Sequence, residues 1–384
     1  MSASLPEKAD VLVVGAGPAG STLARDLAAS GVDVVIIDKA RFPRGKTCGG
    51  GVNVRVQKLL PFDLTPVVEQ VITGISFTCN FESPFVRRSP EPLILTVRRE
   101  TFDSFLLDRA REAGARFFER SACLALRAQG DSVEVETSAG ICRARYVAGA
   151  DGALGFTARR MNGGKEEGCL LAVHSEAPDS MLPDWDPTLI HIDWGSVKRS
   201  YAYLFPKKHF LSMGAGGFGV PSVQIKKYHR AYMATRWQKE ATLPFSAAGF
   251  FVPLRKKRAP IFEGRRLQIG DAAGLIDPFT GEGIYSAVRS ARIAGRVLQE
   301  ALKGGWDSLK PYQDAIDAEL MPELEYSRVL RGFFNLRPGY FHRKIASKDR
   351  WWSAMVRIIR GEKTFLDVKK KMGPVGSLLL RMAR

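Results

Sequence analysis

The sequence is poor in cysteine, and its few cysteines are scattered. Five occur among 384 residues, an odd number, and no two of them form a C-x-x-C pair. This pattern argues against a disulfide framework, a zinc site and a cysteine-ligated iron–sulfur cluster, so we predict no metal site. Free thiols persist in a reducing compartment, and we therefore expect a cytoplasmic protein. The five are Cys48, Cys79, Cys123, Cys142 and Cys169.

Long apolar runs are missing as well. No segment has the roughly 18 uninterrupted apolar residues of a membrane span, and the polar N-terminus lacks the pattern of a cleavable signal. Acidic residues are outnumbered, because 57 Lys and Arg against 40 Asp and Glu give a formal net charge of +17. Such a charge suits nucleic acid, anionic membrane surfaces or acidic ligands. The composition, 45% hydrophobic and 25% charged, is that of a soluble globular protein.

The first forty residues carry the most informative motif. An apolar run at 9–14 predicts a strand, a helix follows to about residue 29, and a second strand is predicted at 32–37. The turn between the first strand and the helix has the spacing G-x-G-x-x-G, and the second strand ends on an acidic residue, which is typical of a dinucleotide site. The residues concerned are Gly15, Gly17, Pro18, Ala19, Gly20, Asp38 and Lys39.

Each residue of this motif has a physical task. Gly15 makes the tight turn, Gly17 lets a pyrophosphate approach the backbone, and Gly20 lets the helix pack close to the sheet. Pro18 suits the first helical position, where no N–H is needed. The free N–H groups of the helix would face the phosphate, and the carboxylate of Asp38 would accept hydrogen bonds from an adenosine ribose.

A second motif lies late in the chain, after a short predicted strand at 267–269. Gly270 and Asp271 begin it, and Gly281, Gly283 and Ile284 open a long predicted helix. A turn aspartate can hydrogen-bond the hydroxyls of a ribityl chain. A helix that begins there would direct its free N–H groups and positive dipole end toward a reduced flavin, which carries negative charge.

The predicted elements alternate between α/β and purely extended segments. Residues 169–219 are mostly extended, as in an antiparallel sheet, and the late helix returns to the α/β pattern. Further helices are predicted at 54–60, 101–113 and 222–238, and further strands at 71–78, 92–97, 116–126, 132–137 and 141–148. We expect a discontinuous nucleotide-binding domain (1–70, 98–160 and 258–305), a sheet-rich substrate domain (71–97 and 161–257) and a helical, basic C-terminal region (306–384).

Two further stretches leave alternatives open. Gly214, Gly216 and Gly219 also have dinucleotide spacing, but Pro221 follows almost at once, so we interpret them as a glycine-rich sheet edge. Beyond residue 343 the chain is basic, and the apolar residues of 351–359 share one arc of a helical wheel. A basic amphipathic helix with tryptophans is typical of an interfacial membrane anchor. The alternative is a helix that packs on its own domain.

Taken together, the early and late glycine motifs resemble those of the p-hydroxybenzoate-hydroxylase-like FAD superfamily. The stretch around Asp151 is similar to that superfamily's third motif, although a simple strand-end turn is the alternative. Within the superfamily, three segments resemble the geranylgeranyl reductase family: a basic lead-in to a Cys-Gly-rich loop at 42–51, an aromatic Y-x-Y-x-F-P segment at 201–206, and D-P-F-T-G-E-G-I at 277–284. Tyr203 stands where the family usually has tryptophan.

The resemblance implies a fold and a set of FAD contacts. The fold class would be α/β, with a Rossmann-like FAD-binding domain, an inserted antiparallel-sheet substrate domain and a helical C-terminal segment. Beyond the residues of the two glycine motifs, FAD contacts would fall on Arg44, Cys48, Gly49, Gly51, Arg99, Cys123 and Asp151. Arg99 could pair with the pyrophosphate, and Cys123 would contribute mainly backbone.

The resemblance also implies a reaction. Members of the family use FAD to reduce carbon–carbon double bonds of isoprenoid chains on lipids, pigments or quinones, so we expect an isoprenoid substrate, with NAD(P)H or ferredoxin as electron donor. Hydride transfer to an unactivated alkene needs a proton donor, and Cys48 and Tyr203 are the candidate acids. Tyr201, Tyr203, Phe205, Phe218 and Phe251 are candidate substrate contacts. The alternative within the superfamily is an FAD-dependent aromatic monooxygenase. We expect no nucleic-acid partner, and a peripheral position on the cytoplasmic membrane face follows only if the amphipathic helix is an anchor.

Overall fold

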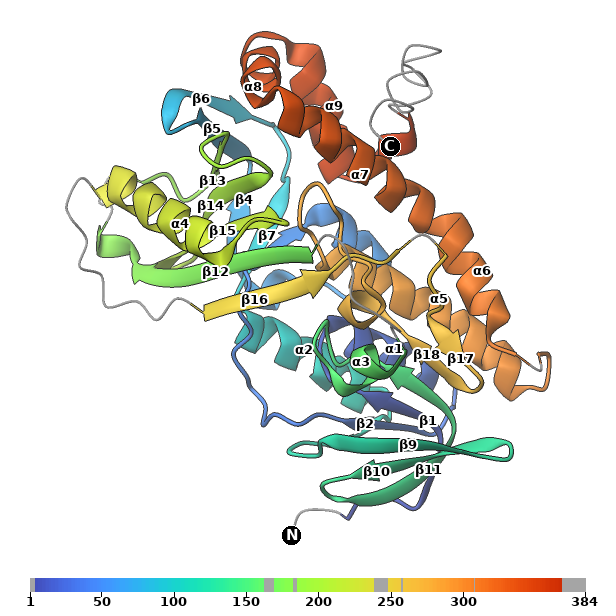
Figure 1. Ribbon diagram of the computed structural model, residues 1–384. Coiled ribbons are helices and arrows are strands. Elements are labelled where there is room, and N and C mark those ends of the chain that lie inside the picture. Colours follow the sequence, from blue (N-terminus) through green and yellow to red (C-terminus); the bar gives the residue numbers. More distant parts are fainter. Residues whose placement is uncertain are drawn as a thin grey trace.

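The computed structural model describes residues 4–161, 169–181, 185–237, 248–256, 258–306 and 308–367, and these form two lobes joined by a row of C-terminal helices (Figure 1). The lower lobe contains a largely parallel sheet covered by helices. The upper lobe contains a second sheet with one helix on its outer face. A small third sheet connects the two lobes. The predicted α/β fold class, with an inserted and mainly antiparallel lobe, is confirmed.

The lower lobe begins with the predicted βαβ unit. Strand β1 (Lys8–Val14) and strand β2 (Val34–Ile37) pair in parallel, and helix α1 (Pro18–Ala28) crosses between them. The residues of β2 are all buried, as expected of a parallel strand covered on both faces. Pro18 is the first residue of α1, where its missing N–H costs nothing.

The remaining strands extend this sheet on both sides. Its order is β17-β18-β11-β1-β2-β8, and β10 joins β11 and β9 in an antiparallel flap. The strands are β8 (Arg116–Phe118), β9 (Cys123–Gln129), β10 (Ser132–Thr137), β11 (Gly140–Gly149), β17 (Phe262–Glu263) and β18 (Arg266–Gln268). The predicted strand 116–126 is therefore two strands, β8 and β9, because the chain leaves the central sheet for the flap after Phe118.

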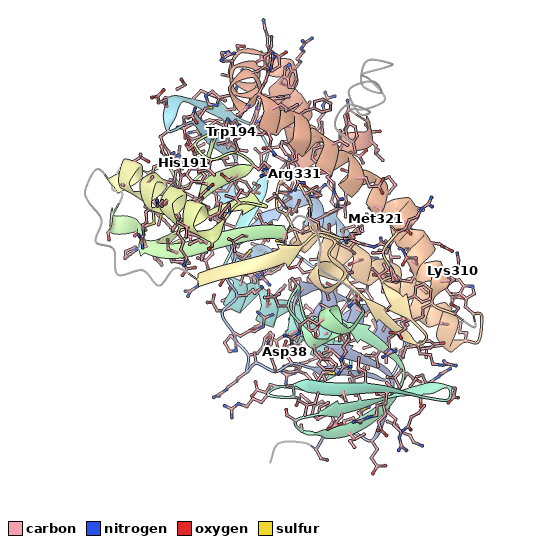
Figure 2. All side chains as sticks on the ribbon, viewed as in Figure 1. Asp38, His191, Trp194, Lys310, Met321 and Arg331 are labelled. Carbon is pink, nitrogen blue, oxygen red and sulfur yellow. The ribbon has the colours of Figure 1, made fainter. Side chains whose placement is uncertain are left out.

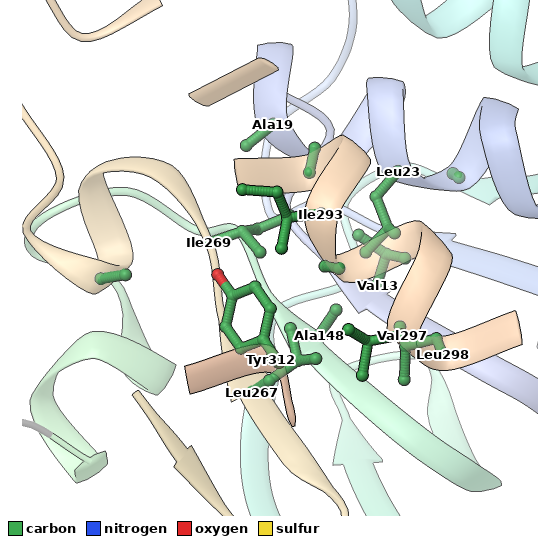
Figure 3. Packing of buried hydrophobic residues seen from close by; sticks show 14 of the residues in the cluster. Val13, Ala19, Leu23, Ala148, Leu267, Ile269, Ile293, Val297, Leu298 and Tyr312 are labelled. Atoms are coloured by element: carbon green, nitrogen blue, oxygen red, sulfur yellow. The ribbon is translucent and has the colours of Figure 1, made fainter. Parts of the chain in front are cut away.

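Helices from both ends of the chain cover the parallel sheet. Helices α1 and α5 (Ile284–Leu302) pack together, and α2 (Arg99–Glu112) lies beside α1. Figure 3 shows how Val13, Leu23, Ile293 and Leu298 interlock in this core. Tyr312 enters the same core from α6 (Lys310–Glu319) and its hydroxyl donates to the carbonyl of Gln268 at 2.7 Å. The beginning of the C-terminal region thus belongs to the core of this lobe.

The upper lobe is a sheet of order β16-β12-β15-β14-β13-β5-β6, antiparallel except where β5 and β13 run in parallel. Helix α4 (Ser222–Trp237) packs on its outer face. The strands are β5 (Gly74–Cys79), β6 (Glu82–Arg88), β12 (Cys169–Pro178), β13 (Leu189–Trp194), β14 (Ser200–Pro206), β15 (Phe210–Phe218) and β16 (Ala248–Pro253).

The second glycine repeat lies mainly in β15, and our interpretation of it as a sheet edge is wrong. Strand β15 is an interior strand that pairs with β12 on one side and β14 on the other. Its glycines leave room for side chains of these neighbours: a Cβ on Gly216 would come within 3.2 Å of Leu170.

The third sheet connects the lobes. It consists of β3 (Gly51–Asn53), β7 (Ile94–Val97) and β4 (Val68–Ile72), so β4 crosses the predicted domain boundary between residues 70 and 71. The predicted helix at 54–60 is a 3-10 helix, Val54–Leu59. The other short elements are α3 (Phe156–Met161) and the 3-10 turns Thr65–Val67, Asp179–Met181 and Gly270–Ala273.

The C-terminal helices run from the lower lobe to the upper lobe along one side of the molecule (Figure 1). After α6 come α7 (Met321–Leu336), α8 (Pro338–Ser347) and α9 (Asp349–Ile359), and α8 contacts β5 and β6. Among the described residues no helix is long and apolar enough to span a bilayer. The basic run at 369–371 and the apolar run at 378–380 lie outside the described part of the chain.

Candidate functional site

A single continuous cavity of about 1170 Å³ runs between the two lobes. It begins at the early glycine turn and Asp38, passes the Cys-Gly loop, and ends against the upper sheet and helices α7 and α9. In Figure 2, Asp38 lies in the lower lobe, whereas Trp194 and Arg331 lie toward the C-terminal helices, so these cavity-lining residues mark its length. The two distant glycine motifs of the sequence therefore face one space.

The early glycine turn is built without room for side chains. Gly15 has φ +105°, and a Cβ there would lie 2.8 Å from the Cα of Asp151. A Cβ on Gly20 would overlap the carbonyl oxygen of Gly15, so helix and turn are in direct contact. The carboxylate of Asp38 accepts hydrogen bonds of 2.8 Å from the N–H groups of Ala16 and Ala40, which holds it at the cavity wall beside the turn.

Positive charge gathers next to this turn. Arg44, Lys46 and Arg99 all line the cavity, and the buried carboxylate of Asp103 holds two of them: Arg99 makes two bonds of 2.8 Å to it, and Arg44 lies at 3.1 Å. Burial, with repulsion from Arg99 and Arg44 and partial relief from Asp271 and Cys48, lowers the pKa of Lys46. Cations that outnumber the adjacent carboxylate favour an anionic ligand such as a diphosphate.

The Cys-Gly loop lies against the aromatic segment of β14. The N–H of Gly50 donates to Cys48 Sγ at 3.3 Å. A Cβ on Gly49 would come within 2.8 Å of the Tyr203 ring, and a Cβ on Gly51 within 2.7 Å of the Phe205 ring. Only glycine allows the loop to pass this close to the two rings.

Behind the loop lies a buried lysine that we did not predict as a site residue. Lys207 is 1% exposed, and its Nζ donates to the carbonyl oxygens of Gly49 at 2.8 Å and Gly50 at 3.4 Å. Burial lowers its pKa to about 7. Its position directly after the aromatic F-P pair was the available signal.

The late motif closes the cavity from the other side. Asp271 lies in the 3-10 turn, and a Cβ on Gly283 would be 2.9 Å from its Oδ1. Helix α5 begins directly after Gly283, and Gly281, Gly283 and Ile284 line the cavity with it. Glu282 is held by Asn53 at 2.7 Å and by Arg55 at 2.5 Å, which fixes the start of α5 to the third sheet.

The aromatic segment presents three rings to the cavity. Tyr201, Tyr203 and Phe205 alternate along β14 and therefore share a face of the sheet. The hydroxyl of Tyr201 donates to the carbonyl of Thr280 at 3.1 Å, which links the upper sheet to the late motif. Burial raises the pKa of both tyrosines, so they are protonated at neutral pH.

The other predicted residues fall into three groups. Ala19, Lys39, Cys123 and Phe218 line the cavity. Asp151 lines it too, but Thr157 holds both of its carboxylate oxygens, as expected of a strand-end turn. Phe251 lies in β16, and its side chain is outside the described part of the structure.

The far end of the cavity is apolar, and we missed most of its wall. It is formed by one face of β5 and β13 and by helices α7 to α9, namely Ile75, Phe77, Ile190, Ile192, Trp194, Phe334, Ile345, Trp351, Met355 and Ile358. The period-two spacing of 190, 192 and 194 was a usable signal. Part of the arc that suggested a membrane anchor, including Trp351 and Met355, thus faces this cavity. Trp352 is buried against the upper sheet, as the alternative of packing on its own domain requires.

The fold and the site define a Rossmann-type flavoprotein, and comparisons with known proteins agree. The FAD binding domain family model matches residues 8–315. The chain is 31% identical over 358 residues to digeranylgeranylglycerophospholipid reductase 1 of Methanopyrus kandleri, covering 84% of this chain and 92% of that protein. It is 30% identical to geranylgeranyl diphosphate reductase of Rhodobacter capsulatus, covering 78% and 77%. The chain belongs to the geranylgeranyl reductase family of FAD-dependent oxidoreductases.

A solved structure supports the same fold. The geranylgeranyl bacteriochlorophyll reductase-like protein of Thermoplasma acidophilum aligns with a TM-score of 0.75 over 98% of this chain and 100% of its own, at 23% identity. The residues present also fit FAD. The glycine turn has no space for side chains, cations line the cavity where a diphosphate would bind, and Asp38 can accept hydrogen bonds from a ribose. The predicted family and the predicted FAD cofactor are thus confirmed.

Proposed function

We propose that this protein saturates carbon–carbon double bonds of an isoprenoid, geranylgeranyl-type chain carried on a lipid, pigment or quinone. The observation that carries the proposal is the continuity of the cavity: its cofactor end opens directly into an apolar chamber walled by aliphatic and aromatic side chains. An extended hydrocarbon chain suits such a chamber, because burying apolar surface there is favourable. The names of the relatives support the same substrate class.

The residues of the chain would supply what the reaction needs around the cofactor. When bound in its reduced form, FAD supplies a hydride. The Cys-Gly loop and the rings of Tyr203 and Phe205 would orient the alkene beside it, and the apolar walls would exclude water. A proton must reach the second alkene carbon, and Tyr203 and Cys48 both line the cavity where this proton is needed. A positioned acid typically contributes about 10²–10⁴-fold.

The electron donor, NAD(P)H or ferredoxin, and a cytoplasmic location at the membrane face remain part of the proposal. The described helices include none that could span a bilayer. The basic surface suits both an acidic protein donor and anionic lipid.

The test uses holoprotein reduced with dithionite under anaerobic conditions and incubated with geranylgeranyl lipids. We expect successive gains of H₂ by mass spectrometry, and no gain with protein stripped of flavin. If the reduced holoprotein leaves every isoprenoid unchanged but hydroxylates a small aromatic compound in air with NADPH, the monooxygenase alternative replaces this proposal.

A further inference from the structure

Three polar side chains, Tyr203, His174 and Glu176, lead from the cavity to the surface across the upper sheet. Tyr203 Oη lies 3.3 Å from His174 Nδ1, and His174 Nε2 lies 3.5 Å from Glu176 Oε1. Tyr203 and His174 are each 7% exposed, whereas the Glu176 side chain is 55% exposed. The row therefore begins at the cavity and ends in solvent.

The strand register explains how Tyr203 reaches across a whole strand to His174. On β12, β15 and β14, His174 pairs with Gly214, and Gly214 pairs with Tyr203. The middle position has no side chain, and a Cβ there would lie 2.7 Å from Tyr203 Cε1. The tyrosine ring lies over Gly214, and its centroid is 6.4 Å from the centroid of the imidazole, with the planes 27° apart.

The titratable and charged groups that face the row come from several elements. The hydrogen bond from His174 lowers the pKa of Glu176, so this carboxylate stays charged at neutral pH. The charges of Arg98 and Lys207 also lower the pKa of Glu176. His229 on α4 faces the sheet from the outer side. His229 is engaged separately, by the hydroxyl of Ser175 at 2.8 Å on the opposite face of β12. Cys48 and Tyr201 are the other titratable groups next to Tyr203.

We propose that Glu176 and His174 form a proton relay that resupplies Tyr203 from solvent, and this rests on the proposed alkene reduction. The Tyr203 O–H bond breaks as a C–H bond forms at the alkene carbon that does not receive the hydride. A His174 that carries both ring protons then passes its Nδ1 proton to the phenolate, becomes a neutral imidazole, and regains a proton from water at Glu176. Each reduced bond consumes one hydride from the reduced flavin and one solvent proton.

In this scheme Tyr203 is the catalytic acid, and His174 and Glu176 act through it. A tryptophan at position 203 could not serve, because its indole N–H is a donor that does not exchange roles with an acceptor. In this chain the tyrosine at position 203 has a histidine within hydrogen-bond reach.

The experiment compares wild type with His174→Gln, Glu176→Gln and Tyr203→Phe as flavin-loaded proteins. His209→Gln, an exposed histidine in the hairpin after β14, is the matched control. The first readout needs no turnover: with ¹⁵N-labelled histidine, of which the chain has five, Tyr203→Phe should shift the Nδ1 resonance of His174, and Glu176→Gln its Nε2 resonance. The second is the rate of alkene reduction over successive turnovers across pH, because the first turnover can use the proton that Tyr203 already holds.

We expect His174→Gln to slow alkene reduction over successive turnovers by about tenfold or more, with a deficit that narrows as pH rises, because the relay needs the Nδ1 proton of a doubly protonated His174. Flavin content and the control variant should match wild type. A wild type that reduces no isoprenoid overturns the proposed function and the relay with it. Two other results overturn the relay alone. In the first, wild type reduces its substrate and His174→Gln keeps the full rate at every pH. In the second, the ¹⁵N resonances of His174 are unchanged in both Tyr203→Phe and Glu176→Gln.

Discussion

Glycine sets how closely backbone and aromatic rings approach one another in this site. Gly49 and Gly51 bring the Cys-Gly loop against Tyr203 and Phe205, and Gly214 does the same for β15. The backbone φ of all three glycines is one that other residues can adopt, so glycine is needed here for space and not for conformation. Adding a methyl group at such a position forces off-rotamer side chains or backbone shifts.

Gly214→Ala should therefore destabilise the protein by about 1–3 kcal/mol, because the new Cβ overlaps the Tyr203 ring. Urea denaturation of the two proteins measures this free energy of unfolding. The control is Gly339→Ala in α8, where the nearest atom is 3.8 Å from the added Cβ, and which should be neutral or slightly stabilising. Equal losses at both positions would show that Tyr203 does not occupy the space above Gly214.

Lys207 should give the stability of the protein a distinctive pH dependence. Burial lowers its pKa to about 7, against an ordinary value of 10.5. Between these values the unfolded chain binds a proton that the folded chain does not, so the free energy of unfolding rises with pH. Above about pH 9 the effect is opposed, because burial raises the pKa of Cys123 to about 12 and that of Cys142 to about 11.

Between pH 7 and 9, comparison with Lys207→Met isolates this lysine, because Lys46, whose pKa is also lowered, is present in both proteins. Over this range the free energy of unfolding of wild type should rise, relative to Lys207→Met, by at most about 1.4 kcal/mol per pH unit. Lys208→Met, at the exposed neighbouring lysine, should keep the wild-type slope. If Lys207→Met and wild type have parallel pH profiles, the lysine keeps an ordinary pKa in the folded state.

At the scale of elements, α9 shows how one helix can serve two surfaces. Trp352 is 7% exposed, and its indole N–H donates to the carbonyl of Arg88 on β6 at 2.8 Å. Its ring packs on Phe77 with centroids 6.4 Å apart. Neighbouring residues of the helix, Trp351 and Met355, line the cavity. The helix therefore holds the upper sheet and closes the apolar chamber.

Trp352→Ala should cost about 3–5 kcal/mol, and Trp352→Phe less, since the phenyl ring keeps part of the packing. Thermal and urea unfolding of both variants measure the difference. Trp306→Ala, at a tryptophan that is 37% exposed, is the control and should cost little. If Trp352→Ala is as mild as the control, α9 does not hold the upper sheet.

Local patterns allowed the prediction of some elements but not of their partners. The βαβ unit, α2 and α5 follow from apolar periodicity and glycine spacing within short windows. The parallel pairing of β5 with β13, the row of His174, Gly214 and Tyr203, and the burial of Lys207 depend on which strands meet, which no local pattern specifies. The same limit made the arc of α9 resemble an anchor, because an apolar face looks alike whether a bilayer or a sheet covers it.

At the scale of the whole molecule, part of the positive charge lies on the exposed face of the C-terminal helices. Near the apolar end of the cavity, Arg343 of α8 and Arg350 and Arg357 of α9 are exposed. These helices lie far from the flap formed by β9 and β10, at the opposite end of the molecule (Figure 1). A membrane that approached the exposed face of α8 and α9 would meet the part of the protein that encloses the apolar chamber.

This arrangement predicts salt-sensitive binding of the holoprotein to anionic vesicles through that face. Each basic residue near an anionic surface contributes about 1 kcal/mol, so changing Arg343, Arg350 and Arg357 together to Glu should weaken binding by about a hundredfold or more. Sedimentation with phosphatidylglycerol vesicles at low and high salt measures this.

The matched control reverses three exposed basic residues at the other end of the molecule, Lys8, Arg111 and Arg120, and so changes the net charge equally. If docking is specific to α8 and α9, the control should lose much less affinity than the first variant, while both keep their flavin. Equal losses would mean that net charge alone attracts the protein to the bilayer, and no binding by wild type would make the prediction wrong. Because Trp352 is buried and Trp351 faces the chamber, the contact predicted here is electrostatic rather than insertion of the helix. Binding that survives high salt would contradict it.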